Sequence, residues 1–177
     1  MATINSKALV RGGKPLDRAY SNGQLVYGRN LLLNSNFVNG FSSWTNENNT
    51  WSVEGSNYKG NPVIKSPIDV GGGNRLLQDL KNTSYTSGEK VTVSFYAKSS
   101  KTGDSMTVVL YNGIYYTINL TTDWVYYTQT MVIPDNFTIP RLYFWNNKVG
   151  DNIWLNSIKM ERGETATPWT PAPEDYI

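Results

Sequence analysis

The chain of 177 residues carries a net charge of +2, is 39% hydrophobic and 17% charged, and has twelve tyrosines and six tryptophans but no histidine or cysteine. This length and composition predict one folded domain with a buried core and exclude a disordered chain. The missing residue types exclude disulfides, thiolate chemistry, zinc sites built on cysteine and any catalytic arrangement that needs histidine, so the aromatic content favours recognition over catalysis.

The first 28 residues are predicted to form a β-hairpin element that precedes the main domain. Two short strand-like runs flank Asn22-Gly23, and Asn-Gly tolerates the positive φ angles of a type I′ turn. Direct pairing across this turn sets Tyr20 against Leu25 and Ala19 against Val26. A lone hairpin is marginally stable in water, so it must pack on the main domain, on a copy of itself or on a partner. Two interpretations stay open: an extra hairpin of the same domain, or a docking element.

From residue 29 to residue 177, short apolar runs with period-two alternation follow one another and are separated by Gly, Asn-Gly, Pro and Ser/Thr clusters. Helical periodicity is hard to find. The pattern predicts an all-β domain with two packed sheets. The expected strands are Asn30–Asn34, Trp51–Gly55, Pro62–Val70, Asn74–Asp79, Lys90–Ser99, Ser105–Tyr111, Ile114–Leu120, Trp124–Ile133, Pro140–Asn146 and Asn152–Glu161.

The last segment, from Thr165 to Ile177, is predicted to be an extended strap or an exit linker. It carries three prolines, which lack an amide donor and so are unsuited to a central strand. Trp169 lies between prolines and is expected to pin the strap onto the body.

Three segments resemble a known family. They are the opening Arg29-Asn30-Leu31-Leu32-Leu33-Asn34-Ser35-Asn36-Phe37 with Gly40 and Trp44, the middle Thr121-Thr122-Asp123-Trp124, and the closing Ile158-Lys159-Met160-Glu161-Arg162-Gly163 with Ala166-Thr167-Pro168-Trp169-Thr170-Pro171-Ala172-Pro173-Glu174-Asp175. Together they resemble the carbohydrate-binding-module-like jelly rolls of tail, baseplate and other structural proteins from phages of Gram-positive bacteria. The run from Tyr20 to Asn30 is similar to the short β-element that leads into such domains. The resemblance covers roughly residues 16–175 and implies a jelly-roll sandwich on a virion, with saccharide binding as an expected activity.

Alternation within the predicted strands indicates which side chains face outward. Leu142 and Phe144 share one face and are expected in the core, which places their neighbours on the outside. The same argument separates Val91, Val93, Phe95 and Ala97 from Tyr96 and Lys98. Exposed rings can stack on the C–H faces of a sugar, while Arg and Lys donate hydrogen bonds to its hydroxyls. The predicted carbohydrate-binding residues are Tyr96, Lys98, Tyr115, Arg141, Tyr143 and Trp145, and the alternative for this surface is an ordinary amphipathic sheet face.

The remaining aromatic residues are assigned mainly to structure. Trp44 and Trp124 match recurrent family positions, which implies that they close the sandwich. Trp154 shares strand parity with Ile158 and Met160, so we expect it to be buried. Trp51 and Tyr58 are less constrained and fit loops or hairpin tips.

No catalytic site or cofactor is predicted. Glycoside hydrolysis needs two carboxyl groups held about 5–9 Å apart, and no pair is evident because the aspartates fall near predicted turns. Glu161 belongs to the closing motif, where a structural role is expected. A structural Ca²⁺ is not favoured, although Asn36, Asp151 and Glu161 are available as oxygen ligands.

The partners follow from the same observations. Basic residues are scattered, so nucleic-acid binding is not expected. No apolar run approaches the roughly 20 residues of a transmembrane helix, and no signal peptide is evident, so membrane insertion is not expected. The expected partners are other virion proteins and host cell-wall or surface polysaccharide. Symmetric tail assemblies favour a homo-oligomer.

The hypothesis is a non-catalytic phage structural protein, exposed on the virion to the extracellular medium, which attaches to host polysaccharide. The alternative is a purely structural decoration or tail protein whose sandwich contacts other virion subunits and binds no sugar. A third interpretation, the non-catalytic module of a lytic enzyme, is less favoured because the chain carries no catalytic partner.

Overall fold

The structure, a computed structural model, describes residues 8–66, 74–81, 84–110, 114–135, 137–146 and 152–176. Its strands and two short 3₁₀ segments are β1 (Val10–Arg11), β2 (Lys14–Pro15), β3 (Arg18–Ser21), β4 (Gln24–Gly28), β5 (Thr45–Asn46), η1 (Glu47–Asn49), β6 (Ser52–Tyr58), β7 (Asn61–Ser66), β8 (Arg75–Asp79), β9 (Lys90–Ser99), β10 (Ser105–Leu110), β11 (Ile114–Asn119), β12 (Val125–Val132), β13 (Arg141–Asn146), β14 (Ile153–Arg162) and η2 (Pro173–Asp175). In this part of the chain no helix is long and apolar enough to cross a membrane.

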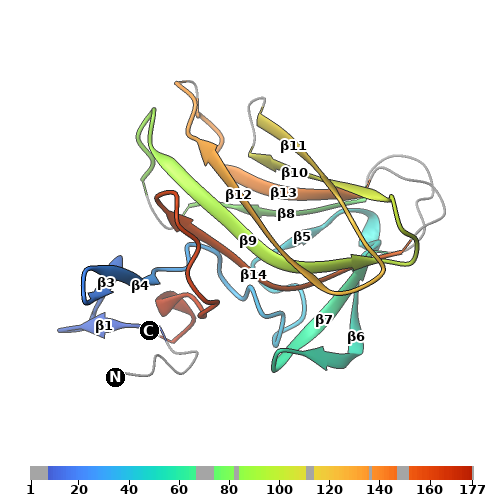
Figure 1. The fold of residues 1–177 in the computed structure, drawn as a ribbon, viewed down its shortest axis with the longest axis horizontal. Coiled ribbons are helices and arrows are strands. Elements are labelled where there is room, and N and C mark those ends of the chain that lie inside the picture. Colours follow the sequence, from blue (N-terminus) through green and yellow to red (C-terminus); the bar gives the residue numbers. More distant parts are fainter. Residues whose placement is uncertain are drawn as a thin grey trace.

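Two five-stranded antiparallel sheets form the body of the molecule (Figure 1). The first sheet has the strand order β11-β10-β13-β8-β5, and the second sheet has the order β12-β9-β14-β7-β6. Consecutive strands change sheet at most connections, as from β8 to β9, from β12 to β13 and from β13 to β14. This is a jelly-roll sandwich, and the predicted fold class is confirmed.

The core lies between the two sheets and is built by alternation within the strands. Leu142 and Phe144 of β13 face inward from the first sheet, and Phe95 of β9 faces inward from the second. The rings of Phe95 and Phe144 meet edge to face with centroids 5.3 Å apart. Each such buried side chain contributes roughly 1.5–3 kcal/mol by leaving water. The inward and outward sets predicted for β9 and β13 are both confirmed.

Strand β11, which pairs with β10, alternates between the core and the solvent. Ile114, Tyr116 and Ile118 pack against the core, while Tyr115 and Thr117 are exposed. Asn112-Gly113, a pair typical of tight hairpin turns, stands between these two strands in the sequence and lies outside the described residues.

The expected strand Asn30–Asn34 is wrong, because this segment forms turns. The buried side chain of Asn30 takes the hydrogen bonds that a strand neighbour would otherwise make: its Oδ1 accepts from the amides of Leu32 (3.1 Å) and Met160 (3.2 Å). Asn34 has a φ of 44°, which a strand does not allow. Side-chain hydrogen bonds of this kind compete with regular pairing. The segment closes one end of the sandwich, where Trp44 is buried as predicted and donates from Nε1 to the Leu33 carbonyl (3.0 Å).

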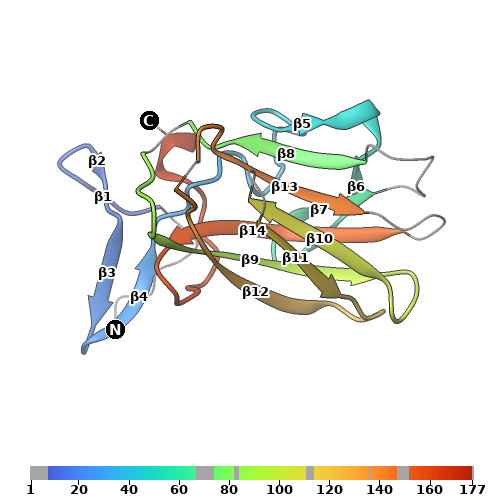
Figure 2. The ribbon, with the colours of Figure 1, turned by 90° about the horizontal axis from the view of Figure 1, so that it is seen from above.

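The N-terminal strands form two small ribbons, β1 with β2 and β3 with β4, at one end of the sandwich (Figure 2). Asn22 and Gly23 have φ values of 51° and 77°, which confirms the predicted type I′ geometry. Tyr20 pairs with Leu25 as predicted. Ala19 pairs with Tyr27 rather than with Val26, because a β-bulge shifts the register between Ala19 and Tyr20.

The C-terminal strap, residues 165–172, crosses the outer side of the second sheet and is fixed there by a buried ion pair. Lys159 and Glu161 of β14 have fully buried side chains, with Nζ and Oε1 3.6 Å apart. Lys159 donates to Thr167 Oγ1 (2.7 Å) and to the Pro168 carbonyl (2.9 Å), while the Thr167 amide and hydroxyl both donate to Glu161 (2.8 Å each). The structural role expected for Glu161 is therefore confirmed.

The same cluster attaches the ribbon of β3 and β4, which we call the N-terminal ribbon, through Gly28 at the end of β4. The Gly28 amide donates to Thr167 Oγ1 (3.0 Å), and a Cβ at this position would lie 1.8 Å from Glu161 Oε2. A glycine is therefore required by this close approach. Burial lowers the pKa of Lys159 to about 8, despite the opposing effect of the nearby Glu161 carboxylate.

Candidate functional site

The outer face of the second sheet carries a row of five half-exposed rings, which we call the aromatic ladder. It comprises Tyr58, Tyr96, Trp124, Tyr126 and Trp154. Tyr58 and Trp124 are stacked with centroids 4.5 Å apart and planes inclined by 14°. The edge of Tyr58 also meets Tyr96 at 5.3 Å, and Tyr96 meets Tyr126 at 4.9 Å. The contacts hold neighbouring rings in fixed orientations, which gives the face a preorganised apolar surface.

Strand register explains why these residues meet. Tyr126 of β12 and Tyr96 of β9 are direct cross-strand partners, and Tyr96 is in turn opposite Asn156 of β14. One row further along, Lys98 of β9 is opposite Trp154 of β14. Side chains at directly paired positions lie on the same face of a sheet, so the pairing of β12, β9 and β14 places Tyr126, Tyr96 and Trp154 on one face. Tyr58 reaches this face from the end of β6, and Trp124 from the residue before β12.

Three lysines lie among the rings, and we call them the ladder lysines: Lys59, Lys65 and Lys98. The ammonium of Lys98 lies 4.9 Å from the ring centre of Trp154 and 5.5 Å from that of Trp124, so it joins the two indoles. Lys65 lies over the Trp154 ring (5.7 Å), and Lys59 lies 5.7 Å from both Tyr58 and Tyr96. These distances are within the range of cation–π attraction.

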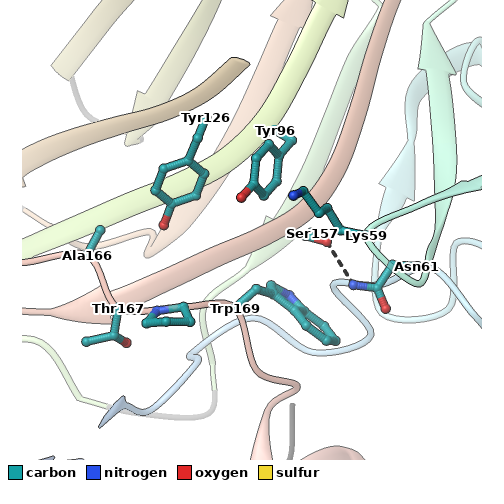
Figure 3. Close-up of a pocket in the computed structure, with 9 residues that line it drawn as sticks. Lys59, Asn61, Tyr96, Tyr126, Ser157, Ala166, Thr167 and Trp169 are labelled. Carbon is teal, nitrogen blue, oxygen red and sulfur yellow. Dashed lines mark hydrogen bonds between the residues drawn. The ribbon is translucent and has the colours of Figure 1, made fainter. Parts of the chain in front are cut away.

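A pocket of about 400 Å³ opens where the ladder meets the C-terminal strap (Figure 3). Its lining residues are Lys59, Asn61, Tyr96, Tyr126, Ser157, Ala166, Thr167, Pro168 and Trp169. The hydroxyl ends of Tyr96 and Tyr126 point from the sheet toward the strap, and Trp169 lies across the opening from them. Burial raises the pKa of the Tyr126 hydroxyl, which therefore stays protonated and able to donate at neutral pH.

The β6–β7 hairpin forms one side of this pocket because β14 has a bulge. Ser157 has a φ of 52°, and the pairing of β14 with β9 shifts register between Asn156 and Lys159. The Asn156 side chain donates to the carbonyls of Asn61 and Pro62 (2.9 Å each), where regular pairing of β7 with β14 has ended. Asn61 donates to Ser157 Oγ (2.8 Å), as Figure 3 shows. These hydrogen bonds fix the hairpin that carries Tyr58 and Lys59.

The six residues predicted to bind carbohydrate do not form one site. Tyr96 and Lys98 lie on the outer face of the second sheet, within the ladder region. The other four lie on the outer face of the first sheet, on the opposite side of the sandwich: Tyr115, Arg141, Tyr143 and Trp145. Period-two alternation separates inward from outward positions, but it does not say which of two outer faces a strand contributes to.

The outer face of the first sheet is less suited to ring stacking. Tyr143 is only 5% exposed and packs with Leu77, Val109 and Trp145. It is covered on the outer side rather than between the layers, so the predicted direction of its side chain is correct. Arg141 donates from Nε to Asp79 Oδ1 (2.6 Å), and the pKa of Asp79 is held below its usual value by this contact. Tyr115 is 59% exposed at the edge strand.

Two tryptophans of the ladder were assigned to the core, and both assignments are wrong. Trp124 is half-exposed and stacks on Tyr58. Trp154 faces outward although Ile158 and Met160 face inward, because the bulge at Ser157 reverses the parity of β14. Conversely Trp51, which was expected on a loop or hairpin tip, is 3% exposed and belongs to the core.

Part of the ladder was detectable in the sequence. Alternation in the expected strand Trp124–Ile133 places Trp124 and Tyr126 opposite Met131 and Ile133, which are buried. Trp154 carried no such signal, since Asn156-Ser157 gives no warning of a bulge. Tyr58 stands at a hairpin tip, as was considered, but its contact with Trp124 depends on the tertiary fold.

No metal site is found in the described part of the chain, where no group of three or more acidic side chains comes together. Of the oxygen ligands considered for Ca²⁺, Glu161 is occupied by Lys159 and Thr167. Asp151 lies outside the described residues.

No protein-family model and no curated protein sequence matches the chain. Solved structures with the same fold do match. The chain is similar to the Family 16 Carbohydrate Binding Module-2, with a TM-score of 0.59 and 19% identity over 74% of this chain and 99% of that one. It is also similar to the CBM22-1 xylan-binding domain from Paenibacillus barcinonensis Xyn10C, with a TM-score of 0.60 and 18% identity over 80% of this chain and 99% of that one.

A third similar structure is the enzymatically active domain of tailspike protein 4 from Bacteriophage CBA120. The TM-score is 0.53 with 13% identity, and the match covers 76% of this chain but 21% of the tailspike chain. At these identities the likenesses establish a shared architecture: the chain has the jelly-roll fold of carbohydrate-binding modules.

Proposed function

We propose that the chain is a non-catalytic carbohydrate-binding module and that the aromatic ladder is its binding face. The observation that carries the proposal is a chain of four contacting rings, extended to Trp154 through the Lys98 ammonium, that meets a polar-rimmed pocket of about 400 Å³. Pyranose rings present C–H faces that pack on aromatic rings, while Asn61, Ser157 and the tyrosine hydroxyls at the pocket supply hydrogen bonds to sugar hydroxyls. The fold shared with carbohydrate-binding modules supports the same conclusion by analogy.

The test compares two tryptophans on opposite faces of the sandwich. Trp154→Ala is expected to weaken binding of the protein to bacterial cell-wall preparations by about tenfold or more, as for a central aromatic contact. Trp145→Ala, on the outer face of the first sheet, is expected to leave binding within twofold or so of the wild type, since it lies far from the ladder. Binding is measured by sedimentation of the protein with purified walls, and thermal unfolding of each variant shows that it is folded.

The opposite result would place the binding site on the outer face of the first sheet, where four of the six residues predicted from the sequence lie. Loss of binding in Trp145→Ala with full binding in Trp154→Ala overturns the ladder as the site. Absence of wall and polysaccharide binding by the wild-type protein would sink the carbohydrate-binding function and favour the alternative, a decoration or tail protein that contacts other virion subunits.

We further propose that the protein works as a structural component of a phage particle, exposed to the medium, and attaches it to host polysaccharide. The motifs shared with phage tail and baseplate jelly rolls and the likeness to a tailspike domain support this role. The N-terminal ribbon would dock on other subunits, because the β3–β4 hairpin projects beyond the end of the sandwich (Figure 2) and its Tyr20 is 61% exposed. Attachment through many copies would strengthen weak single-site binding. Co-purification of the protein with intact particles, and its loss when residues 1–28 are deleted, tests this assignment.

A further inference from the structure

We propose that the saccharide bound by the aromatic ladder is anionic, carrying carboxylate or phosphate groups along its chain. The inference rests on the proposed function and concerns the chemistry of the ligand. Its basis is the charge of the ladder, where three ammonium groups lie among the rings of Tyr58, Tyr96, Trp124 and Trp154.

The ladder lysines are not neutralised by the protein. Within the described residues, no carboxylate lies at ion-pair distance from Lys59, Lys65 or Lys98. Their contacts are with aromatic faces, which attract a cation without cancelling its charge. A neutral polysaccharide can accept hydrogen bonds from these lysines only through its hydroxyl and ring oxygens, whereas an anionic one also gains the stronger hydrogen bonds between opposite charges.

The opposite face of the sandwich provides an internal comparison. There Arg75 pairs with Glu47 (2.7 Å), and Arg141 and Lys81 both pair with Asp79 (2.6 and 3.4 Å). Each of these three cations has a carboxylate partner, as do Lys90, Lys159 and Arg162 of the second sheet, whereas the three ladder lysines have none within the described residues. The ladder is thus a place where, in the described part of the chain, three ammonium groups lie beside aromatic rings without a carboxylate at ion-pair distance.

Strand pairing spreads the cations along the ladder. Lys65, Trp154 and Lys98 form one cross-strand row through β7, β14 and β9, so an indole lies between two ammonium groups. Lys59 stands at the pocket end, beside Tyr58 and Tyr96. An alternation of ring and cation matches a polymer that alternates a sugar ring with a negative group. Polymers of uronic acids and polymers linked by phosphodiesters both have this chemistry.

The experiment measures the affinity of the wild-type protein for four purified polymers by isothermal titration at 50 and 500 mM NaCl. Polygalacturonate carries carboxylates, a poly(hexosamine 1-phosphate) polysaccharide carries phosphodiesters between its sugar rings, and xylan and hydroxyethylcellulose are neutral. We expect at least one anionic polymer to bind more tightly than both neutral ones. Its association constant should fall by about tenfold or more at high salt, because the screening length shrinks from about 10 Å at 0.1 M to about 3 Å at 1 M. The arm that binds better, carboxylate or phosphate, identifies the anion.

Matched variants separate the ladder from general charge. Lys65→Gln/Lys98→Gln is expected to lower affinity for the anionic polymer by roughly tenfold, since it removes two charges at the indoles. Lys81→Gln changes an exposed lysine that follows β8 of the first sheet, and it should lower this affinity less than about twofold. Inorganic polyphosphate, which has the charge without sugar rings, should bind more weakly than the anionic polysaccharide and should be indifferent to Trp154→Ala.

The outcomes distinguish the two proposals. Tight binding of a neutral polymer, unaffected by salt and by Lys65→Gln/Lys98→Gln, overturns the anionic ligand and leaves the carbohydrate-binding function intact. The inference is also overturned if Lys81→Gln lowers affinity for the anionic polymer as much as Lys65→Gln/Lys98→Gln does. Binding of polyphosphate as tight as that of any polysaccharide would overturn it too. Failure of every polymer and wall preparation to bind removes the carbohydrate-binding function itself.

Discussion

At the scale of single residues, Lys159 is a charged group whose side chain is fully buried. Its ammonium is enclosed with Glu161 beneath the strap, and every hydrogen-bond partner of the pair comes from Thr167 or Pro168. Desolvation of two charges offsets much of their attraction, so such a pair adds little net stability while being costly to break. The sequence motif Ile158–Gly163 identified these positions by resemblance, and only the structure reveals that they join the sheet to the strap.

Breaking the pair on one side is therefore expected to cost more than removing both charges. Lys159→Met leaves a carboxylate buried without a cation and should lower the free energy of unfolding by about 3–5 kcal/mol. Lys159→Met/Glu161→Gln should recover a substantial part of that loss. Lys90→Met, which removes an exposed ion pair with Glu164, serves as the control and should cost less than about 1 kcal/mol. Urea unfolding measures all three, and a Lys159→Met cost equal to that of Lys90→Met would contradict this account.

At the scale of elements, strand β14 determines both halves of the candidate site. Its first residues place Trp154 in the ladder, its bulge at Ser157 positions the β6–β7 hairpin, and its last residues hold the strap. A bulge inserts a residue without interrupting the strand, and it redirects the side chains that follow. Strand β14 therefore contributes both to the aromatic ladder and to the pocket beside the strap, which lie on the outer face of the second sheet.

Asn156 is the residue at which this arrangement is most easily tested. Asn156→Ala leaves the carbonyls of Asn61 and Pro62 without their donor and should lower the free energy of unfolding by about 1–3 kcal/mol. Hydrogen exchange should accelerate in the β6–β7 hairpin more than in the first sheet. Gln78→Ala removes a comparable buried amide, bonded to Leu33, and should not loosen the hairpin selectively. Uniform acceleration in both variants would show that Asn156 stabilises the whole fold rather than the hairpin.

The same element shows how far the sequence predicts this structure. Alternation predicted the faces of β9 and β13 correctly, because regular strands repeat with a period of two. It failed for Trp154, because a single bulged residue reverses the parity and leaves no compositional trace. Alternation within a strand also does not indicate which distant strand it pairs with, and so it does not indicate which sheet it joins. The predicted site therefore combined residues of two opposite faces, Tyr96 and Lys98 on one and Tyr143 and Trp145 on the other.

At the scale of the whole molecule, the free energy of unfolding depends on pH through a buried lysine, whose pKa is lowered, and through buried tyrosines, whose pKa values are raised. The pKa of Lys159 is about 8 in the folded chain against an ordinary value of 10.5, so between these values the unfolded chain binds more protons. Stability must then rise with pH in that window. Burial raises the pKa of Tyr85 and Tyr27 above the ordinary value of 10, so their contribution is complete below pH 10 and is lost above it.

The free energy of unfolding is accordingly expected to increase by on the order of 1–2 kcal/mol from pH 7.5 to pH 9.5 and to fall beyond pH 10. Urea titrations at half-unit pH intervals measure this profile. In Lys159→Met/Glu161→Gln the rise should disappear while the fall above pH 10 persists. A rise that survives in this variant would assign it to another group.

The cluster at Gly28, Thr167 and Glu161 also has a mechanical consequence. The ribbon enters the sandwich and the strap leaves it at the same end, where Arg29 is ion-paired with Glu174 and the Asn34 amide donates to Asp175 (2.9 Å). Tension applied between these two segments would load those few contacts and bypass most strands of the sandwich. The ends would separate before the strands of the two sheets. Because Thr167, Pro168 and Trp169 of the strap line the pocket, this separation would open the pocket while the rings carried by β9, β12 and β14 stayed in place.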